Sequence, residues 1–297
     1  MVPAEQESFS VWCTQFFTEH LIQFSVLQDE FISILHNFLS WLLAKFIICK
    51  LTYFIPRQVK HKMNLFTIAD LHLPLGSNKP MDIFGGWDNY VERIEKNWKK
   101  LVGDNDTVVI AGDVSWGISL TESKPDFQFI NSLPGKKIIL KGNHDYWWST
   151  ANKINEFLCE NKFDTISILH NNCYFDGNIA ICGTRGWIYD GTGEHDQKVI
   201  LREASRLETS IKQAINNNLK PIVFIHYPPV YAEYVCEEIL AILKKYSIDV
   251  VYYGHIHGKG IYNIVPEYEG IKLKHVAADG VDFTPQFVSK CNLFEKV

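Results

Sequence analysis

The chain has 297 residues, 46% of them hydrophobic, which is enough to bury a core as one large domain or two small ones. Its formal net charge of -5 argues against a generally basic surface for binding extended nucleic acid. The seven cysteines are scattered and form no C-x-x-C pair. This argues against a disulfide framework or a cysteine zinc site and indicates reduced thiols in a cytoplasmic protein.

The first 62 residues differ in texture from residues 63–297, and we expect them to form a helical hydrophobic extension. Residues 31–55 are nearly continuous in Phe, Ile, Leu and Trp at helical spacing, but Lys45 interrupts the window that a spanning helix needs. Nothing marks a signal peptide. Three interpretations stay open: a helix that contacts a membrane through residues 31–55, a helix that packs on the main domain or a partner, and a stretch upstream of a true start at Met63.

Residues 63–297 alternate apolar, β-rich runs with amphipathic stretches. The pattern predicts a helix over 88–101 with Asp88 as its N-cap, and further helices over 124–133, 149–161, 194–217 and 233–245. Predicted strands cover 65–69, 107–111, 137–141, 166–170, 173–175, 179–182, 221–225, 249–253, 261–265 and 272–277. Strands that alternate with helices predict an α/β fold with a largely parallel sheet, and the strand-rich middle and end predict a second sheet packed on the first.

Five of these strands run directly into residue types that bind metal ions. In open α/β sheets, ligands bind beyond the carboxyl ends of the strands, so we expect the five strand ends to form one site. Any one motif is also explained as an ordinary turn, but five in succession leave that explanation little room. The residues are Asp70 and His72, Asp113, Asn143 with His144 and Asp145, His226, and finally His255 with His257.

The donor set indicates metal-dependent hydrolysis. Carboxylate, imidazole and amide ligands without thiolate suit Mn, Fe or Zn, and seven such side chains are too many for one tetrahedral ion. A carboxylate that bridges two cations about 3.5–4 Å apart is a common arrangement for hydrolysing phosphate esters. We therefore expect two divalent or trivalent metal ions. They would lower the pKa of a shared water, so that hydroxide attacks phosphorus.

The motif order Asp-x-His, Gly-Asp, Gly-Asn-His-Asp, His, Gly-His-x-His resembles the calcineurin-like metallophosphoesterases, and among them the small bacterial predicted phosphohydrolases. The resemblance covers about Met63 to Val288 and implies a sandwich of two mixed β-sheets flanked by helices. It implies that His144 protonates the leaving oxygen and that Asp145 orients His144. It also implies one ion on Asp70, His72, Asp113 and His257, and a second on Asn143, His226, His255 and the bridging Asp113.

The implied activity is hydrolysis of a phosphoester, by a phosphatase or phosphodiesterase, in a small phosphorylated or nucleotide substrate. Two alternatives stay open: a membrane-associated lipid-phosphate hydrolase, and a non-catalytic scaffold with this fold. Trp116 departs from the Asp or Asn that the family often has at this position, and indicates a more apolar pocket. Arg185, after the strand over 179–182, is a candidate phosphate clamp, with a surface arginine in a turn as the equally weighted alternative.

Overall fold

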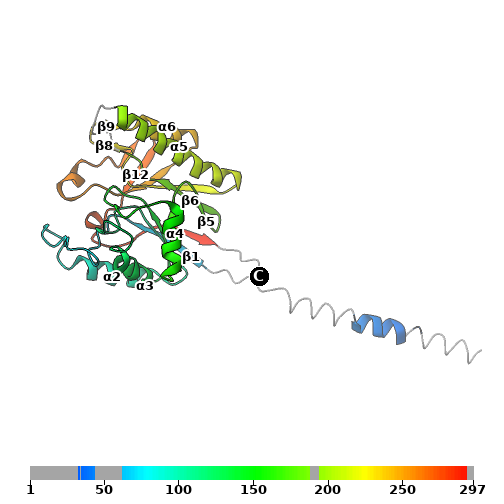
Figure 1. Ribbon diagram of the computed structural model, residues 1–297. Coiled ribbons are helices and arrows are strands. Elements are labelled where there is room, and N and C mark those ends of the chain that lie inside the picture. The colour runs from blue at the N-terminus through cyan, green and yellow to red at the C-terminus, as the bar shows by residue number, and fades with distance from the viewer. Residues whose placement is uncertain (1–32, 34, 44–61, 188–193, 293–297) are drawn as a thin grey trace, which may run out of the picture. The chain divides into compact units, whose positions relative to one another are not determined.

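Two β-sheets form the framework of the computed structural model, which describes residues 33, 35–43, 62–187 and 194–292 (Figure 1). The five-stranded sheet has the order β13-β1-β2-β3-β4, in which β1 to β4 are parallel and β13 is antiparallel to β1. These strands are β1 (Lys62–Ile68), β2 (Thr107–Ile110), β3 (Lys136–Leu140), β4 (Ile166–Leu169) and β13 (Gln286–Asn292).

The six-stranded sheet has the order β11-β12-β10-β7-β6-β5, with a parallel centre and an antiparallel strand at each edge. A separate hairpin joins β8 (Val230–Tyr231) to β9 (Tyr234–Val235). The strands of the sheet are β5 (Tyr174–Asp176), β6 (Ile179–Thr184), β7 (Lys220–Ile225), β10 (Val250–Tyr253), β11 (Glu267–Tyr268) and β12 (Ile271–His275). The predicted sandwich of two mixed sheets is therefore confirmed.

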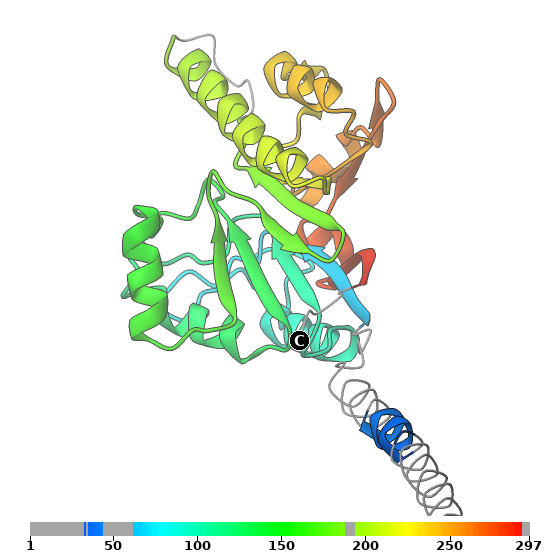
Figure 2. The same ribbon diagram turned by 90° about the vertical axis from the view of Figure 1, so that its right-hand side faces the viewer.

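Helices cover the outer face of each sheet (Figures 1 and 2). Side chains alternate between the faces of a strand, so each sheet sends one set of apolar residues to its helices and the other set to the opposite sheet. The layer between the sheets includes Leu65, Val109, Ile181 and Phe224, all buried. Over the five-stranded sheet lie α2 (Tyr90–Leu101), α3 (Lys124–Ser132) and α4 (Ala151–Glu160), and over the six-stranded sheet lie α5 (Glu194–Asn216) and α6 (Glu237–Lys245).

Two local predictions are wrong, and one strand was missed. Asp88 does not cap α2, because the helix begins at Tyr90 and its N-cap is Asn89, a left-handed residue with φ 50°. The stretch predicted as a strand over 261–265 lies largely in a 3-10 helix, η1 (Gly258–Asn263), whose first glycine has φ 55°. The sequence pattern missed β13, which adds an antiparallel edge beside β1. The left-handed residues Asn89 and Gly258 are local turns that apolar periodicity does not reveal, and the pairing of β13 with β1 is long-range.

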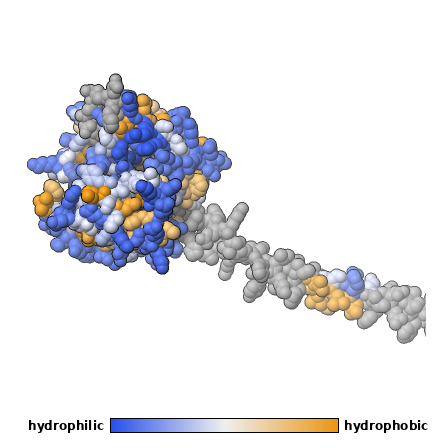
Figure 3. All heavy atoms as spheres, in the orientation of Figure 1, coloured by the Kyte–Doolittle hydropathy of each residue, from blue (hydrophilic) through white to orange (hydrophobic). Residues whose placement is uncertain are grey.

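The chain divides into two compact units, Met1–Gln58 with Lys296–Val297, and Val59–Glu295. In the first unit, residues 33 and 35–43 are helical and exposed, and Figure 3 shows apolar side chains along this helix. The remainder of the predicted hydrophobic extension over 1–62 lies almost entirely outside the described residues. No helix in the described part of the chain combines the length and apolarity needed to cross a bilayer.

Candidate metal centre

The seven side chains expected to bind metal converge at one edge of the sandwich. They follow β1, β2 and β3, which are neighbours in one sheet, and β7 and β10, which are neighbours in the other. Backbone hydrogen bonds hold these ends together: Asp70 N donates to Gly112 O (2.9 Å), and Gly254 N donates to His226 O (3.1 Å). Ala69 N donates to Val276 O (2.8 Å), which joins the two sheets. The topology thus places residues far apart in sequence around one point.

The backbone at these strand ends is sharply turned. Asp70, His72, Asp113 and His255 all have positive φ, between 45° and 71°, a conformation that costs energy for residues other than glycine. Gly142 leaves room for one of these carboxylates, because a Cβ on it would lie 2.0 Å from Asp113 Oδ1. The motifs therefore combine candidate ligands in left-handed conformations with Gly142, whose missing side chain lets the end of β3 approach Asp113.

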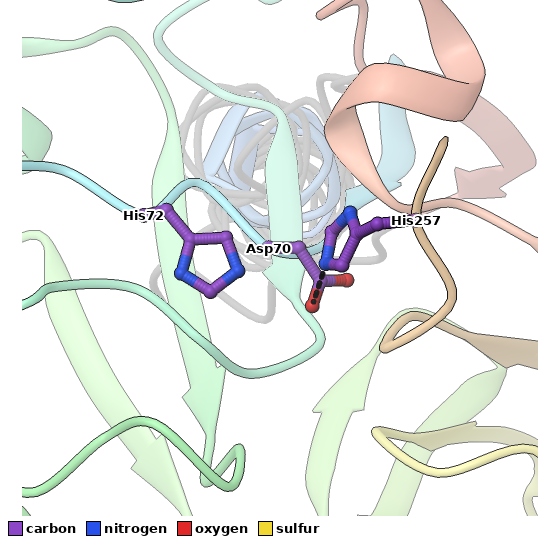
Figure 4. Close-up of side chains that lie close together, drawn as sticks. All are labelled: Asp70, His72 and His257. Carbon is purple, nitrogen blue, oxygen red and sulfur yellow. Dashed lines mark hydrogen bonds and ion pairs between the residues drawn. The ribbon is translucent and has the colours of Figure 1, made fainter. Parts of the chain in front are cut away.

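One group of candidate ligands comprises Asp70, His72 and His257, whose ligand atoms all lie within 4.8 Å of one another. Figure 4 shows the two imidazoles on either side of the Asp70 carboxylate. His257 Nε2 lies 3.2 Å from Asp70 Oδ1, while its Nδ1 donates to Asp279 Oδ1 (2.8 Å). A carboxylate behind an imidazole fixes the ring and its tautomer, as is common for histidines that bind metals.

A second group comprises Asp70, Asp113 and His226, and Asn143 lies beside it. Asp113 Oδ2 is 3.5 Å from His226 Nε2 and 3.8 Å from His72 Nε2, so this carboxylate lies between histidines of both groups. Asn143 Oδ1 lies 2.6 Å from His226 Nε2. The two groups share Asp70, and the Asp113 carboxylate lies near histidines of both groups.

The donor atoms fit a cation better than they fit one another. His226 Nδ1 lies 3.0 Å from the carbonyl of Ala111, and because a carbonyl only accepts, Nδ1 carries the proton. The lone pair of Nε2 then faces Asn143 Oδ1, which His255 Nδ1 also approaches to 2.9 Å. Lone pairs that converge at such distances are stabilised by a positive charge between them. The residues present therefore fit a metal ion.

At His72 and His226, but not at His257, the electrostatics favour the neutral imidazole that metal binding requires. Burial lowers the pKa of His72 to about 3 and that of His226 to about 4, so both imidazoles are neutral at pH 7. Burial also opposes the charge of His257, but Asp70 and Asp279 raise its pKa to about 10. Neutral imidazole is the form that binds metals, and a bound cation would compete for the Nε2 atom of His257.

Burial acts in the same direction on the two central carboxyl groups, but their neighbours shift the two pKa values in opposite directions. Burial raises the pKa of Asp113 well above its usual range, and the nearby Asp70 and Asp145 carboxylates raise it further. Burial would also raise the pKa of Asp70, but the charge and hydrogen bond of His257 lower it below its usual range. Both side chains are at most 1% exposed. Two buried carboxyl groups at such proximity repel when ionised, and cations remove that cost.

His144 lies at the rim of the centre. Its backbone N donates to Asp113 Oδ1 (2.7 Å), and its ring packs 4.9 Å from that of Trp116. Its Nδ1 lies 3.3 Å from the Tyr146 hydroxyl. Burial lowers the pKa of the ring. The imidazole is thus near the candidate ligands without lying in either of the two groups.

Asp145 has a different environment from the one expected. Its carboxylate accepts hydrogen bonds from the backbone N of Asp113 (2.9 Å), Val114 (2.8 Å) and Gly142 (2.7 Å), and from the Trp147 indole (3.0 Å). Among the described residues, no hydrogen bond joins it to the His144 ring. The carboxylate instead joins the turns after β2 and β3, and the role of Asp145 in orienting His144 stays a prediction.

Arg185 also departs from expectation. Its guanidinium lies over the Trp187 ring (4.7 Å), with Nη2 3.8 Å from Glu203 Oε1, and it lines a cavity apart from the candidate ligands. Among the described residues, no hydrogen bond or ion pair joins this guanidinium to a candidate ligand. Arg185 therefore lies apart from the candidate ligands, and its role as a phosphate clamp stays a prediction.

Two supporting residues escaped the sequence analysis. Asp279 accepts from His257 Nδ1 and from Gly258 N (2.9 Å), and the Tyr90 hydroxyl donates to the carbonyl of His72 (2.7 Å). Asp279 follows a predicted strand, so the strand-end rule that selected the other motifs applies to it as well. Tyr90 gives no such signal, because its contact depends on how α2 packs.

An apolar cavity of about 620 Å³ opens beside the centre. His72, His144 and His257 form the side nearest to the candidate ligands, and the His72 ring stacks on Trp116 at 4.6 Å. The expected apolar pocket around Trp116 is thus present. The remaining lining residues are Met81, Phe84, Gly85, Trp87, Gly258 and Lys259.

Comparisons with known proteins give one family and several distant structures. A model of the calcineurin-like phosphoesterases matches residues 63–259. Gene 66 protein of Mycobacterium phage L5 is 34% identical over 85 residues, which cover 28% of this chain and 40% of that protein, so the chain spans less than half of this relative.

Three solved structures are similar at low identity. A protein of unknown function from Aquifex aeolicus is 18% identical with a TM-score of 0.43, over 76% of this chain and 95% of that one. A phosphopantetheinyl hydrolase from Mycobacterium tuberculosis is 14% identical with a TM-score of 0.42, over 77% and 97%. A purple acid phosphatase from yellow lupin seeds is 15% identical with a TM-score of 0.41, over 81% and 47%.

Proposed function

This chain belongs to the calcineurin-like phosphoesterase family, and we propose that it hydrolyses a phosphoester bond in a small substrate at a dinuclear metal centre. The observation that carries the proposal is the arrangement of His226, whose Nδ1 is committed to a carbonyl while Nε2 lies 2.6 Å from Asn143 Oδ1. Lone pairs aimed at one point by five strand ends favour a bound cation over a structural polar cluster.

The proposed ligand sets extend the two groups with neighbouring side chains and assign the shared position to Asp113. Asp70, His72, His257 and Asp113 would hold one ion, and Asn143, His226, His255 and the shared Asp113 the other. When bound, the ions would lower the pKa of a water molecule and offset negative charge on the phosphoryl oxygens. Manganese, iron and zinc all suit this combination of oxygen and nitrogen donors.

We assign His144 the role of general acid. Its Nδ1 is near the Tyr146 hydroxyl, and Nε2 makes no hydrogen bond to a residue in the described ranges, so Nε2 is available to a leaving oxygen. A phosphate dianion beside the ring would raise the pKa of His144, against the effect of burial, and favour the protonated form. Asp145 we assign as a positioning residue, because it holds the turn that carries His144.

The cavity beside the centre favours a phosphoester whose other half is apolar or aromatic. Trp87, Trp116, Met81 and Phe84 offer flat and flexible apolar surface next to His144. Such walls bind a nucleobase, another aromatic group or a short acyl chain through burial and stacking. The phosphoryl group would lie toward the histidines, and the apolar group toward the tryptophans.

The test is turnover of p-nitrophenyl phosphate and bis-p-nitrophenyl phosphate by the full chain with added Mn²⁺, combined with elemental analysis. We expect hydrolysis of at least one ester, about two metal equivalents, and loss of activity with EDTA. Asp113→Asn removes a charge from the shared ligand, and we expect it to lose metal and activity by at least ~10²-fold. The exposed Asp164, changed to Asn, is the matched control.

The outcome also separates the rival interpretation as a scaffold. Zero turnover of every ester with metal bound would favour a non-catalytic protein that keeps this fold. Hydrolysis without any bound metal, unaffected by Asp113→Asn, would contradict the proposed centre.

A further inference from the structure

A second cavity, of about 440 Å³, is lined by residues other than the candidate ligands and has the opposite character to the apolar one. It is formed at the carboxyl end of β3, which also precedes a candidate ligand, and at those of β4 and β6, which are the next strands outward from the ligand-bearing strands in the two sheets. Lys141 directly precedes the Gly142–Asn143 turn. The carbonyl of Arg185 accepts from His226 N (3.1 Å). Lys141 is therefore linked to a candidate ligand through the chain, and Arg185 through a backbone hydrogen bond.

Positive charge dominates the described lining of this cavity. Four cations, Lys141, Arg185, Arg202 and Arg206, face one carboxylate, Glu203, which leaves a formal excess of +3. The excess is notable because the whole chain carries a net charge of -5. The N-terminal end of α4, at residues 149–151, also lines the cavity, and its helix dipole adds to the attraction for an anion.

The one carboxylate does not satisfy these cations. Glu203, which is 1% exposed, is hydrogen-bonded to Arg206 Nη1 (2.8 Å) and to the Thr184 hydroxyl (2.6 Å). Arg185 Nη2 is 3.8 Å from Glu203, beyond a hydrogen bond, and its buried Nε has no partner. Lys141, half-buried, makes no hydrogen bond or ion pair with any residue of the described ranges. The ammonium group of Lys141 and the Nε of Arg185 therefore have hydrogen-bond donors available for a ligand.

We propose that this cavity binds a phosphate-like anionic group through Lys141 and Arg185, with Arg206 completing its wall. Gathering like charges in a half-buried cavity costs free energy, and an anion that accepts their hydrogen bonds offsets it. Two sources share this chemistry: a second anionic group of the substrate, whose ester lies at the metal centre, or a free inorganic anion that acts as an effector.

The first experiment separates the cavity from the metal centre. Inorganic phosphate is titrated by calorimetry into the full chain carrying Asp113→Asn, in EDTA, so that a metal ion does not contribute to binding. We expect saturable binding that weakens ~10-fold, about 1.4 kcal/mol, on adding either Lys141→Gln or Arg185→Gln. Lys141→Arg keeps the charge and should retain most of the affinity, which controls for misfolding.

The matched control is Lys212→Gln, because Lys212 is an exposed cation on α5, the helix that carries Arg206, but does not line the cavity. It should leave the affinity unchanged. Absence of saturable binding would overturn the proposal, and so would an equal loss in Lys212→Gln, since that indicates general charge attraction. Neither result bears on turnover at the metal centre, so the two proposals fail separately.

A second experiment identifies the source. The metal-loaded full chain and its Lys141→Gln variant are compared on glucose 1-phosphate and glucose 1,6-bisphosphate. A rise in KM confined to the bisphosphate assigns the cavity to the substrate. A rate on both esters that responds to added inorganic phosphate in the unchanged chain, but not in Lys141→Gln, assigns it to an effector. If Lys141→Gln leaves the KM for both esters unchanged and added phosphate does not change the rate, the cavity binds neither the substrate nor an effector.

Discussion

Individual residues at the centre keep conformations that local structure alone would not select. Asp70, His72, Asp113 and His255 are all left-handed, at a cost of the order of 1 kcal/mol or more each. Such residues persist only where the surroundings determine them, and they cluster at functional sites. Here the left-handed conformations direct lone pairs from separate strands toward one point, as a binding site for cations requires.

His144 is the residue whose role is most sharply testable. It lies beside the ligands without belonging to either group, so His144→Ala should keep the metal and lower kcat by ~10²-fold or more, the usual scale for a lost general acid. Elemental analysis and steady-state kinetics measure the two effects. Tyr146→Phe, which removes only the hydroxyl near Nδ1, should change kcat far less. A metal-free His144→Ala protein would show that the assigned roles are wrong.

At the scale of the elements, Asp145 joins the turn after β2 to the turn after β3. Its carboxylate accepts three backbone N–H groups from the turns after β2 and β3 and one indole N–H. Asp145→Asn replaces one acceptor oxygen with a donor that faces these groups, so buried N–H groups lose their partner at about 1–3 kcal/mol.

We therefore expect Asp145→Asn to lower Tm by several degrees, at ~2–4 °C per kcal/mol, and to weaken metal binding. Thermal unfolding and metal titration measure these changes, and the exposed Asp164→Asn is the control. A variant with unchanged Tm and metal affinity but reduced kcat would instead indicate a direct catalytic role for Asp145.

A second buried carboxyl group, Asp126 of α3, joins the loop after β1 to the turn after β2. It accepts from Leu75 N (2.7 Å) and is bonded to the Ser115 hydroxyl (2.5 Å). Burial raises its pKa to about 7, although these hydrogen bonds oppose the shift. The folded chain therefore binds this proton more tightly than the unfolded chain, whose carboxyl titrates near 3.9.

Folding stability from Asp126 is thus present below about pH 4 and is lost as the pH rises toward 7. Asp126→Asn has no proton to lose, so the Tm of the unchanged chain should fall relative to this variant between pH 5 and pH 8, by about 4 °C or more. Thermal unfolding at fixed ionic strength measures the difference. A constant difference across this range would show that the carboxyl does not titrate there.

How far the site could be predicted from the sequence depends on how its strands and helices are arranged. The strand-end motifs were predictable because each needs only an apolar run followed by a metal-binding residue, and parallel strands bring such ends together. The partners of Asp145 and the second cavity around Arg185 depend on which strands are neighbours across two sheets, which the order of motifs does not state. The rule that a metal-binding residue type follows a predicted strand could also have selected Asp279, but it could not have predicted the hydrogen bond between Asp279 and His257.

For the whole molecule, two sheets meet so that their carboxyl edges bring together the residues of the candidate metal centre. Three histidines at this edge line an apolar cavity, and a separate cationic cavity is lined by Lys141 and Arg185. The centre lies in the unit that spans Val59–Glu295, and all of its candidate ligands fall between Asp70 and His257. Among the described residues of that unit, removing residues 1–62 takes away Lys62, the first residue of β1, which pairs with Asn292. The catalytic site should therefore not depend on the N-terminal segment.

We accordingly expect the chain from Met63 to Val297 to fold and to hydrolyse water-soluble esters with a kcat/KM within about twofold of the full chain. The exposed Leu35, Phe38 and Leu39 on the N-terminal helix motivate a parallel measurement, co-sedimentation of both chains with phosphatidylglycerol vesicles. If the shorter chain hydrolyses soluble esters equally well but loses both vesicle binding and activity on a phospholipid-like ester, the substrate is a lipid phosphate. Loss of soluble-ester activity in a folded shorter chain would instead make residues 1–62 part of the catalytic domain.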